Sequence, residues 1–488
     1  MKILLMNPPF KPQYGKFSRE QRSPAITKSG TFYYPMWLAY ATGLLEKNGH
    51  ECILLDAPAE RIDYNECILR LDGFKPDLIV VDTSTPSIYN DVSIAADLKK
   101  RYGAFVVLVG PHPSALPEDT LRIDENVDAV AMREYDYILV NLAALLEARS
   151  GQPSKEDLLG IKGIAFRKKS EIIVNEKAEM PQDLDSIPFV SSVYKKHLNY
   201  KNYFYAHSKY PIVTIVSGRG CPHQCIYCVY PQVFNGRRVR NRSIKNVVDE
   251  MEYIIKNFPE IKEIMFEDDT LTLDKKRCIE LSEEILKRGI KIEWSANSRA
   301  DVDLDTMYAL KRAGARLFCV GIESGDQEVL DSMKKNLKIE RVKQFFIDSK
   351  KAGIKIHGCF LVGNPKETKE TLEKTLSLAL TLEPDTAQFF PIMAYPGTEI
   401  YDWAYKNGYL KTTDYSKWLD DCGMHNSVMS RPELTDRDLV SFCDKARKRF
   451  YLRVSYISKK FLQGLFDSYE MKRLVKGGVN LLKTYLIK

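Results

Sequence analysis

The sequence predicts an α/β protein in three parts: an N-terminal Rossmann-like doubly wound domain, a central partial (β/α)6 TIM-type barrel and a C-terminal helical region. Short apolar runs alternate with amphipathic helical patterns through residues 1–148, and the alternation returns between residues 211 and 400. Strands that alternate with helices form parallel sheets. Residues 401–488 show helical patterns without such runs, so we expect helices there.

The composition is that of an ordinary globular protein. Hydrophobic residues make up 44% and charged residues 28% of the 488 residues, which is enough chain for two to four domains. No apolar run reaches membrane-spanning length and no signal-peptide pattern is present. We therefore expect a cytoplasmic protein whose ten cysteines are reduced. The net charge of +7 is too mild to indicate a nucleic-acid partner by itself.

Residues 1–148 are expected to form the first domain. Its strands are predicted at the apolar runs 2–6, 50–55, 78–81, 105–109 and 127–132. Its helices are predicted at 36–48, 64–72, 90–101 and 136–149. The loops after the strands of such a sheet line one crevice. No Gly-x-Gly-x-x-Gly follows the first strand, which argues against a dinucleotide.

Residues 149–205 are expected to link the two domains. A small hairpin is predicted at 160–166 and 171–174, followed by an acidic, proline-bounded stretch at 180–188. Five tyrosines follow, and packing is favoured over a binding role for them: Tyr194, Tyr200, Tyr203, Tyr205 and Tyr210.

Residues 206–400 are expected to form the barrel. Six apolar runs, each followed by a helical pattern, are the predicted strands: 211–216, 263–266, 290–294, 317–320, 354–362 and 387–393. Such a barrel has its functional loops on the face where the strands end.

Three cysteines follow the first barrel strand at Cys-x3-Cys-x2-Cys spacing: Cys221, Cys225 and Cys228. A cuboidal iron–sulfur cluster normally takes one cysteine per iron, so three leave one iron open to a small molecule. Structural zinc would need a fourth ligand, and His223 lies between two of the thiols rather than on a second knuckle. An electron-transfer cluster would want a fourth cysteine nearby, but the next is Cys278, fifty residues on.

This spacing, with Tyr227 just before the third cysteine, resembles the radical S-adenosylmethionine (SAM) superfamily. In that superfamily the open iron of a 4Fe-4S cluster chelates the amino and carboxylate groups of SAM. Reduction then cleaves the sulfonium and yields a 5′-deoxyadenosyl radical. The resemblance implies an oxygen-sensitive enzyme and an electron donor such as flavodoxin or ferredoxin.

The resemblance covers about two hundred residues and carries over a SAM site. It implies that the loop after the second barrel strand meets the methionyl group of SAM, that two charged residues contact its carboxylate, amine or ribose, and that residues 358–365 line its adenine. Alternatively, the two aspartates of that loop could cap the next helix. The positions implied are Glu267, Asp268, Asp269, Arg299, Glu323 and Gly363.

The first domain resembles the cobalamin-binding domain found ahead of many radical SAM barrels. The matching residues follow its predicted strands: Asn7, Thr83, Ser84, Thr85, Gly110, His112, Arg133 and Glu134. Classical corrinoid domains carry Asp-x-His-x-x-Gly, and no histidine here has that context, so we expect no histidine ligand below the cobalt. The alternative is a degenerate domain that binds nothing and packs on the barrel. Aromatic residues at 31–37 could contact corrin or substrate, or pack at the domain interface.

The C-terminal region is basic. From Lys445 onward it holds twelve basic residues and two acids, interleaved with aromatic and aliphatic residues. Such helices can lie on an anionic membrane surface. We favour the alternative, a helical layer that covers the open barrel with its charges in water.

The resemblance implies a cobalamin-dependent radical SAM enzyme that methylates an unactivated carbon of a small-molecule or lipid-like substrate. In the family, one SAM methylates the cobalamin and a second is cleaved by the cluster. A cyclase or oxidase of tetrapyrrole or hopanoid type is the alternative. A non-catalytic corrinoid or redox sensor would lack the charged residues of a SAM site, so Arg299 and Glu323 argue against it. Methylthiolating relatives in the family carry three cluster cysteines in their N-terminal domain. Only two cysteines, Cys52 and Cys67, lie in the first domain here, so methylthiolation is disfavoured.

Overall fold

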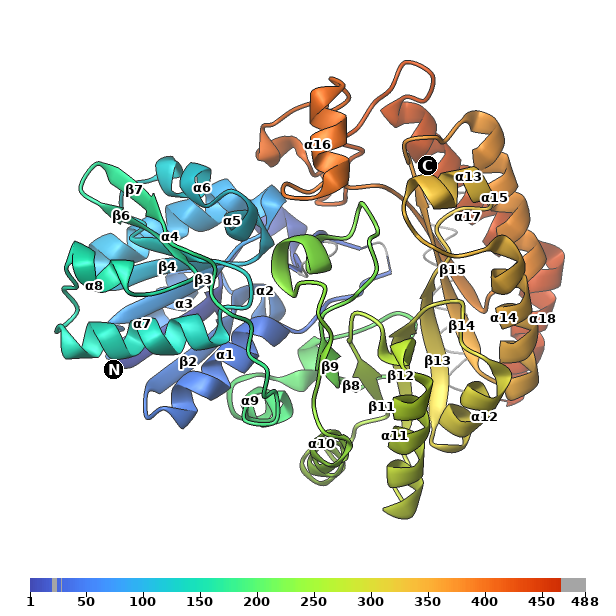
Figure 1. Cartoon of the computed structure of the whole chain (residues 1–488), viewed down its shortest axis with the longest axis horizontal. Coiled ribbons are helices and arrows are strands. Elements are labelled where there is room, and N and C mark those ends of the chain that lie inside the picture. The colour runs from blue at the N-terminus through green and yellow to red at the C-terminus, as the bar shows by residue number, and fades with distance from the viewer. Residues whose placement is uncertain (20–23, 28, 467–488) are drawn as a thin grey trace.

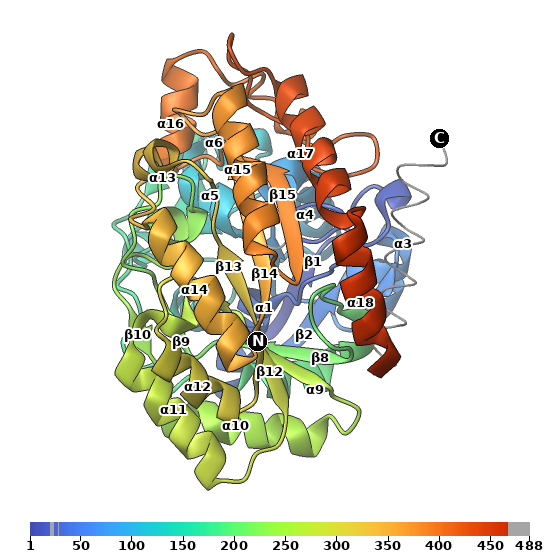
Figure 2. The same cartoon turned by 90° about the vertical axis from the view of Figure 1, so that its right-hand side faces the viewer.

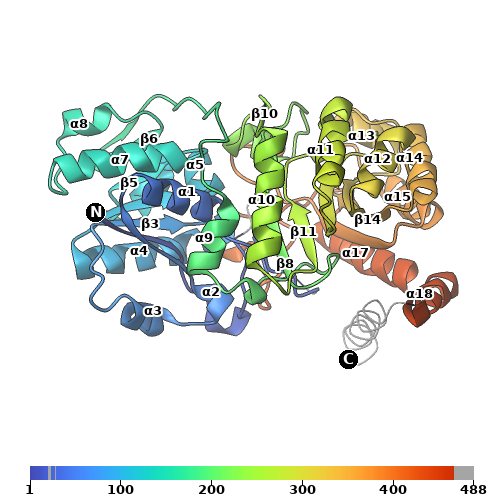
Figure 3. The same ribbon diagram turned by 90° about the horizontal axis from the view of Figure 1, so that it is seen from below.

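The computed structural model describes residues 1–19, 24–27 and 29–466. A mixed sheet and a parallel sheet lie side by side, with α9 (Val190–His197) and α10 (Ile244–Asn257) between them in the view from below (Figure 3). The N-terminal sheet and the barrel share one hydrophobic core, which runs through α1, α7 and the linker into the barrel. The predicted fold class is confirmed.

The N-terminal sheet has the order β2-β1-β3-β4-β5-β6-β7. Its parallel strands are β1 (Lys2–Asn7), β2 (Glu51–Asp56), β3 (Leu78–Asp82), β4 (Phe105–Val109) and β5 (Ala129–Ala131). Its main helices are α1 (Met36–Lys47), α3 (Tyr64–Arg70), α4 (Ile88–Tyr102), α6 (Pro117–Ile123) and α7 (Asp136–Ala148). Shorter helices are α2 (Ala57–Glu60), α5 (Pro111–Ala115) and α8 (Lys155–Leu159).

The hairpin predicted in the linker is present as β6 (Ile164–Lys168) and β7 (Glu171–Val174), but it does not stand alone. β6 pairs antiparallel with β5 and extends the N-terminal sheet. The sheet therefore runs to Val174, whereas the domain boundary at 148 stays a prediction.

The barrel sheet is parallel throughout, with the order β15-β14-β13-β12-β11-β8 (Figure 1). Its strands are β8 (Ile212–Ile215), β11 (Glu263–Phe266), β12 (Glu293–Ser298), β13 (Ala315–Gly321), β14 (Lys355–Val362) and β15 (Thr386–Pro391). Its further helices are α11 (Lys275–Lys287), α12 (Leu304–Arg312), α13 (Gln327–Ser332), α14 (Ile339–Ala352) and α15 (Lys369–Leu382). The six strand–helix units predicted from the sequence are thus confirmed.

One strand boundary was wrong. The third strand was expected at 290–294, but β12 begins at Glu293 and continues to Ser298. Ser295 and Asn297 are polar strand residues, which sequence patterns count as loop; the Asn297 amide donates to Glu267 of the neighbouring loop at 3.2 Å.

The C-terminal region is only partly helical, which corrects the expectation of helices throughout. Its helices are α16 (Glu399–Lys406), α17 (Asp436–Tyr451) and α18 (Val454–Phe466). Residues 407–435 hold one 3-10 turn and isolated bridges, because aspartate side chains stabilise turns there. Asp420 Oδ1, for example, accepts hydrogen bonds from the backbone N–H groups of Cys422 and Met424, both at 2.9 Å.

This irregular stretch reaches the first domain. The hydroxyl of Tyr14 donates to the backbone oxygen of Asp420 at 3.1 Å, and Ile26 N–H donates to that of Gly423 at 2.8 Å. A small separate core forms at this contact from Phe10, Tyr14, Phe17, Ala25 and Leu419. Segments about 400 residues apart therefore close one side of the interface between the domains.

Helix α17 packs against β15, the edge strand of the barrel sheet (Figure 2). The hydroxyl of Tyr451 bonds both the N–H and the carbonyl of Ala387, at 2.9 and 2.7 Å. Tyr451 thus provides hydrogen-bond partners for backbone groups at the open edge of the barrel sheet, and α17 covers that edge. Among the described helices none is both long and apolar enough to cross a membrane. The last part of the basic region, 467–488, lies outside the described residues.

Candidate functional site

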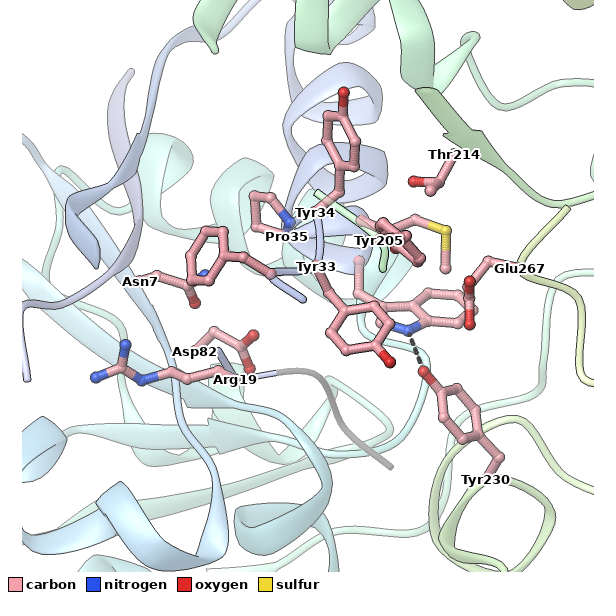
Figure 4. Close-up of a pocket in the computed structure, with 13 residues that line it drawn as sticks. Asn7, Arg19, Tyr33, Tyr34, Pro35, Asp82, Tyr205, Thr214, Tyr230 and Glu267 are labelled. Carbon is pink, nitrogen blue, oxygen red and sulfur yellow. Dashed lines mark hydrogen bonds between the residues drawn. The ribbon is translucent and has the colours of Figure 1, made fainter. Parts of the chain in front are cut away.

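The strand ends of both sheets open on one cavity between the domains (Figure 4). Asn7 and Asp82 reach it from β1 and β3 of the first domain, and Thr214 and Glu267 reach it from the barrel. The full lining is Asn7, Arg19, Phe32, Tyr33, Tyr34, Pro35, Met36, Trp37, Asp82, Tyr205, Thr214, Tyr230 and Glu267.

The three cysteines lie on the loop that follows β8 and β9 (Gly218–Arg219). Cys221 and Cys225 are buried, Cys228 is half-buried, and none of the three forms a disulfide. The amide of Gln232 donates to the carbonyls of Cys225 and Cys228 at 3.2 and 3.0 Å, which fixes the backbone between them. Burial raises the pKa of the Cys221 thiol, so a bound cation is needed to hold it as a thiolate.

The acidic loop after β11 holds this cysteine loop. Asp268 accepts hydrogen bonds from the Ser217 N–H at 2.9 Å and from its hydroxyl at 2.6 Å. Asp269 accepts from Gly220 N–H at 3.0 Å. Burial raises the pKa of Asp268 to about 6, even though both bonds from Ser217 favour its charged form. The alternative that these aspartates cap the next helix is wrong, because Asp274 caps α11.

Glu267, the first residue of that loop, faces the cavity instead (Figure 4). The three implied acids thus divide between two positions: Asp268 and Asp269 hold the cysteine loop, and Glu267 lines the cavity. Their roles toward SAM stay predictions.

A buried charged cluster lies beside the cysteines. Lys335 Nζ donates to Glu323 Oε1 at 2.7 Å, and the hydroxyl of Tyr227 donates to the same oxygen at 2.9 Å. The backbone of Glu323 has φ +69°, an uncommon conformation for a residue with a side chain. Burial works to lower the pKa of Lys335, but the negative charges of Glu323 and Cys225 together outweigh it and raise that pKa. No sequence motif pointed to Lys335.

Arg299 follows β12 and is buried near the same cluster. Its Nη2 donates to the carbonyls of Lys335 and Asn336 at 3.1 and 3.0 Å, and its Nε donates to Asp301 at 3.1 Å. Arg299, Glu323 and Lys335 therefore place two cations and one anion at the strand ends. SAM carries a carboxylate, an amine and a diol, which such a set can bind.

Gly363 directly follows β14 and has φ +101°. A Cβ there would lie 3.0 Å from a methyl group of Leu439 on α17. The N–H groups of Gly363 and Asn364 both donate to Glu367, whose pKa burial raises to about 7. This turn is therefore tightly packed, and its role against adenine stays a prediction.

The crevice of the first domain has polar atoms that lack partners. Asn7 Oδ1, Asp82 Oδ1 and Thr83 Oγ1 are buried and have no hydrogen-bond partner among the described residues. Buried atoms of this kind can accept hydrogen bonds from a ligand or from water. Gly110, with φ +115°, approaches so closely that a Cβ would lie 2.4 Å from the Thr83 carbonyl. These features fit a polar-edged ligand such as cobalamin.

Other predicted crevice residues bond one another. Ser84 and Ser87 hydroxyls lie 2.8 Å apart, and His112 Nδ1 lies 3.2 Å from Thr85 Oγ1. Burial lowers the pKa of His112 to about 3, so it is neutral. Its ring packs on Tyr415 at 4.7 Å between centroids. The structure thus brings the C-terminal segment onto this part of the crevice.

Arg133 and Glu134, unlike the other predicted crevice residues, contact residues of the linker and the barrel. Arg133 has φ +65°, and its Nη2 lies 3.9 Å from Met180 Sδ in the linker. Glu134 is buried and accepts hydrogen bonds from two barrel arginines, Arg219 and Arg240. Its contact with cobalamin stays a prediction.

The aromatic residues at 31–37 pack at the domain interface and also line the cavity, while their contact with corrin or substrate stays a prediction. Tyr34 stacks on Tyr203 of the linker at 4.0 Å and donates to the Ile212 carbonyl at 2.7 Å, which is interface packing. Tyr33 and Trp37 line the cavity together with Tyr34. Trp37 Nε1 donates to the hydroxyl of Tyr230 at 3.2 Å, the dashed line in Figure 4.

The donor sets decide which cofactors fit. No three His, Cys, Asp or Glu side chains of the described ranges converge on a single metal ion, so the zinc alternative gains no support. An iron–sulfur cluster takes one cysteine per iron, so its ligands need not converge on one point. Three unbridged thiols, two of them buried, fit such a cluster.

Comparison with known proteins agrees with this geometry. The model of the radical SAM superfamily matches residues 215–379, and that of the B12 binding domain matches residues 22–143. An uncharacterized methyltransferase of Pyrococcus horikoshii is 29% identical over 488 residues, 99% of each chain. An anaerobic magnesium-protoporphyrin IX monomethyl ester cyclase of Cereibacter sphaeroides is 28% identical over 426 residues, 86% of this chain and 67% of the cyclase.

A solved structure shares the fold. The radical S-adenosylmethionine methyltransferase TsrM from Kitasatospora setae matches with a TM-score of 0.66 and 19% identity, over 84% of this chain and 77% of that one. A radical SAM barrel behind a B12-binding domain is thus the class that fold and site define. The chain carries both domains that define the cobalamin-dependent radical SAM enzymes, and it is similar to members of that class.

Proposed function

We propose that the protein methylates an unactivated carbon of a small-molecule or lipid-like substrate. The observation that carries the proposal is a cavity between the domains, which residues at the strand ends of both sheets line. When bound, the cluster with SAM supplies a radical that abstracts hydrogen, and cobalamin supplies the methyl group. The substrate carbon must reach both, and the cavity between the domains offers that position.

The residues of the chain would bind and orient these groups. Cys221, Cys225 and Cys228 would hold the cluster. Arg299 and Glu323 would bind the charged and hydroxyl groups of SAM, as charge-assisted hydrogen bonds are the strong ones. Lys335 is an addition to that set, supported by its buried contact with Glu323.

The first domain would bind cobalamin at the ends of β1 and β3. The unpaired atoms of Asn7, Asp82 and Thr83 would gain partners from it. Tyr33 and Trp37 would exclude water from the cavity, which protects reactive groups from side reactions.

Product analysis tests the proposal. Protein purified and reconstituted without oxygen is given cobalamin, dithionite and SAM, and both SAM products are counted. Methylation predicts S-adenosylhomocysteine together with 5′-deoxyadenosine once substrate is present. The Cys221→Ala variant is the matched inactive control. Intact protein with a cluster but no 5′-deoxyadenosine would favour the sensor.

The alternative is ring formation or oxidation. It is supported by the 28% identity to a magnesium-protoporphyrin IX monomethyl ester cyclase. A cyclase consumes SAM to 5′-deoxyadenosine without S-adenosylhomocysteine. The ratio of the two products therefore separates this reading from methylation.

We also propose a cytoplasmic protein that takes electrons from a flavodoxin or ferredoxin. Dithionite would replace that donor in vitro, so reduction of the cluster by a purified flavodoxin is the direct test. Failure of both flavodoxin and ferredoxin to reduce a cluster that dithionite reduces would contradict it.

A peripheral membrane contact is the weaker proposal for α18. Five of its apolar side chains point to solvent, with Val454 82% and Phe461 56% exposed. The others are Ile457, Leu462 and Leu465. A basic helix with such a face can bind an anionic bilayer.

Vesicle flotation tests this contact. Vesicles with anionic lipid should float the protein, and neutral vesicles should not. The double variant Ile457→Ser, Phe461→Ser should lose flotation without loss of fold, because both side chains are exposed. A protein that never floats would contradict the membrane proposal.

A further inference from the structure

Two arginines of the barrel part extend their side chains into the first domain. Arg219 on β9 and Arg240 on β10 (Arg240–Asn241) are direct partners in an antiparallel ribbon. β9 lies between the two sheets (Figure 1). The guanidinium of Arg219 lies over the rings of Trp37 and Tyr40 on α1, at 4.9 and 4.8 Å. This ribbon, which leads into the cysteine loop, is therefore anchored in the B12-binding domain.

Both arginines share one acceptor. Arg219 Nη1 donates to Glu134 Oε2 at 3.1 Å and also to Asp136, the first residue of α7. Arg240 Nη1 donates to Glu134 Oε2 at 2.9 Å, and its Nη2 donates to Oε1. All four side chains are at most 2% exposed.

Stability alone does not explain this network. A buried ion pair often contributes little net stability, because both charges lose their water. Its better-attested use is to fix the register of two structural pieces, since any misplacement leaves a buried charge unpaired. Here the two pieces are the cofactor domains.

On the barrel side the network reaches the cysteine loop. Arg219 precedes Gly220, whose N–H donates to Asp269 at 3.0 Å. Arg240 Nη2 donates to the Asn235 carbonyl at 3.0 Å, and the Asn235 amide donates to Asp269 at 3.1 Å. Both arginines therefore connect, within one or two hydrogen bonds, to the backbone just before Cys221.

On the other side the network reaches the crevice. The N–H of Arg133, next to Glu134, donates to Ser114 Oγ at 2.7 Å. The Ser114 hydroxyl donates to the Gly110 carbonyl at 2.7 Å. Gly110 borders the unpaired Oδ1 of Asp82 and the backbone carbonyl of Thr83. Hydrogen bonds and adjacent residues thus connect the crevice of the first domain to the cysteine loop.

We propose that Glu134, held by Arg219 and Arg240, is a positioning residue that fixes the distance between the cobalamin crevice and the cluster loop. This role does not require Glu134 to contact the corrin. This role rests on the proposed function only in that both cofactors bind. Hydrogen abstraction and methyl transfer act on one carbon, and a misplacement of about 1 Å can cost about 100-fold in rate.

Pulsed EPR spectroscopy on the holoenzyme tests the role, because the distance between cob(II)alamin and the reduced cluster can be measured directly. The variants are Glu134→Gln, which removes the shared charge, and Arg240→Lys, which keeps the charge but loses the bidentate geometry. The control is Arg316→Gln, which breaks a buried pair with Glu263 inside the barrel. We expect both interface variants to bind both cofactors but to show a shifted or broadened distance distribution. The Arg316 variant should keep the wild-type distance.

Other outcomes overturn the role. Wild-type distances in both interface variants would refute it. Loss of the cobalamin spectrum from Glu134→Gln alone, with an unchanged distance in Arg240→Lys, would make Glu134 a corrin contact instead. Wild-type protein that shows neither cofactor signal would refute the proposed function itself, so the two failures are distinguishable.

Discussion

Gly220 offers a sharp test of how the cysteine loop is built. Its φ of +95° lies in the left-handed region, and a Cβ there would lie 2.2 Å from the Arg238 carbonyl oxygen. Carbon and oxygen normally meet at about 3.3 Å, so Gly220→Ala must move the loop or its neighbour by about 1 Å. The left-handed backbone costs a further 1–2 kcal/mol or so. Since Gly220 precedes Cys221, we expect the displacement to fall on a cluster ligand.

Iron analysis of anaerobically reconstituted protein measures the result. Wild type should hold about four irons per chain, as one 4Fe-4S cluster requires, and Gly220→Ala should hold less than about one. The matched control is Gly289→Ala, which has φ +64° but no atom within 4 Å of a built Cβ. It should lose about 1–2 kcal/mol of stability and keep its iron. Full iron content in Gly220→Ala would refute this account of the loop.

Three further predictions concern buried polar groups. The carboxyl of Glu367 has its pKa raised by burial to about 7, so the folded protein holds this proton more tightly than the unfolded chain. Its contribution to stability therefore falls as pH rises from about 4.5 to 7, by up to about 3 kcal/mol, and Glu367→Gln should gain that amount over wild type in the same window. Lys335→Met leaves Glu323 buried without its cation, so we expect a loss of about 3–5 kcal/mol in stability and at least tenfold weaker SAM binding by equilibrium dialysis. Thr83→Val removes a buried hydroxyl that has no partner in the described chain; cobalamin-free stability should change little, while cobalamin retention on gel filtration should fall.

Each of these three predictions has a result that would contradict it. A difference between Glu367→Gln and wild type that does not vary with pH would refute the titration. For Lys335 the neighbouring Lys334→Met is the control, because Lys334 pairs with Glu399 while both side chains remain about half exposed; equal loss of SAM from both variants would remove the special role. Thr83→Val that retains cobalamin fully would show that its hydroxyl is not a ligand contact.

The fold could be predicted because its signals are local. Buried parallel strands are short continuous apolar runs, such as Leu78–Asp82, and each stands out from the amphipathic helices around it. The prediction failed where polarity lies inside the barrel, as in β12, and where aspartate turns replace helix, as between α16 and α17. In both places the controlling interaction lies outside the local window.

The candidate site likewise combines residues that could be identified from the sequence with residues that could not. The cysteine spacing is local and specific, so the loop could be found from the sequence. Lys335 could not, because its partner Glu323 lies on another segment and no motif joins them. The two aspartates were recognised as site residues, but their bonds to Ser217 and Gly220 depend on how the loops after β8 and β11 fold together.

Glu134 shows why a strand end is ambiguous in sequence. In a parallel sheet the residue after a strand faces the crevice, where a ligand approaches. In this protein the neighbouring domain approaches the same edge, and its arginines reach the carboxylate. A strand-end acid can therefore serve the cofactor or the interface, and only the pairing of Arg219 with Arg240 on one ribbon distinguishes them. Because that ribbon runs directly into the cysteine loop, residues that hold the two domains together also set where the cluster lies.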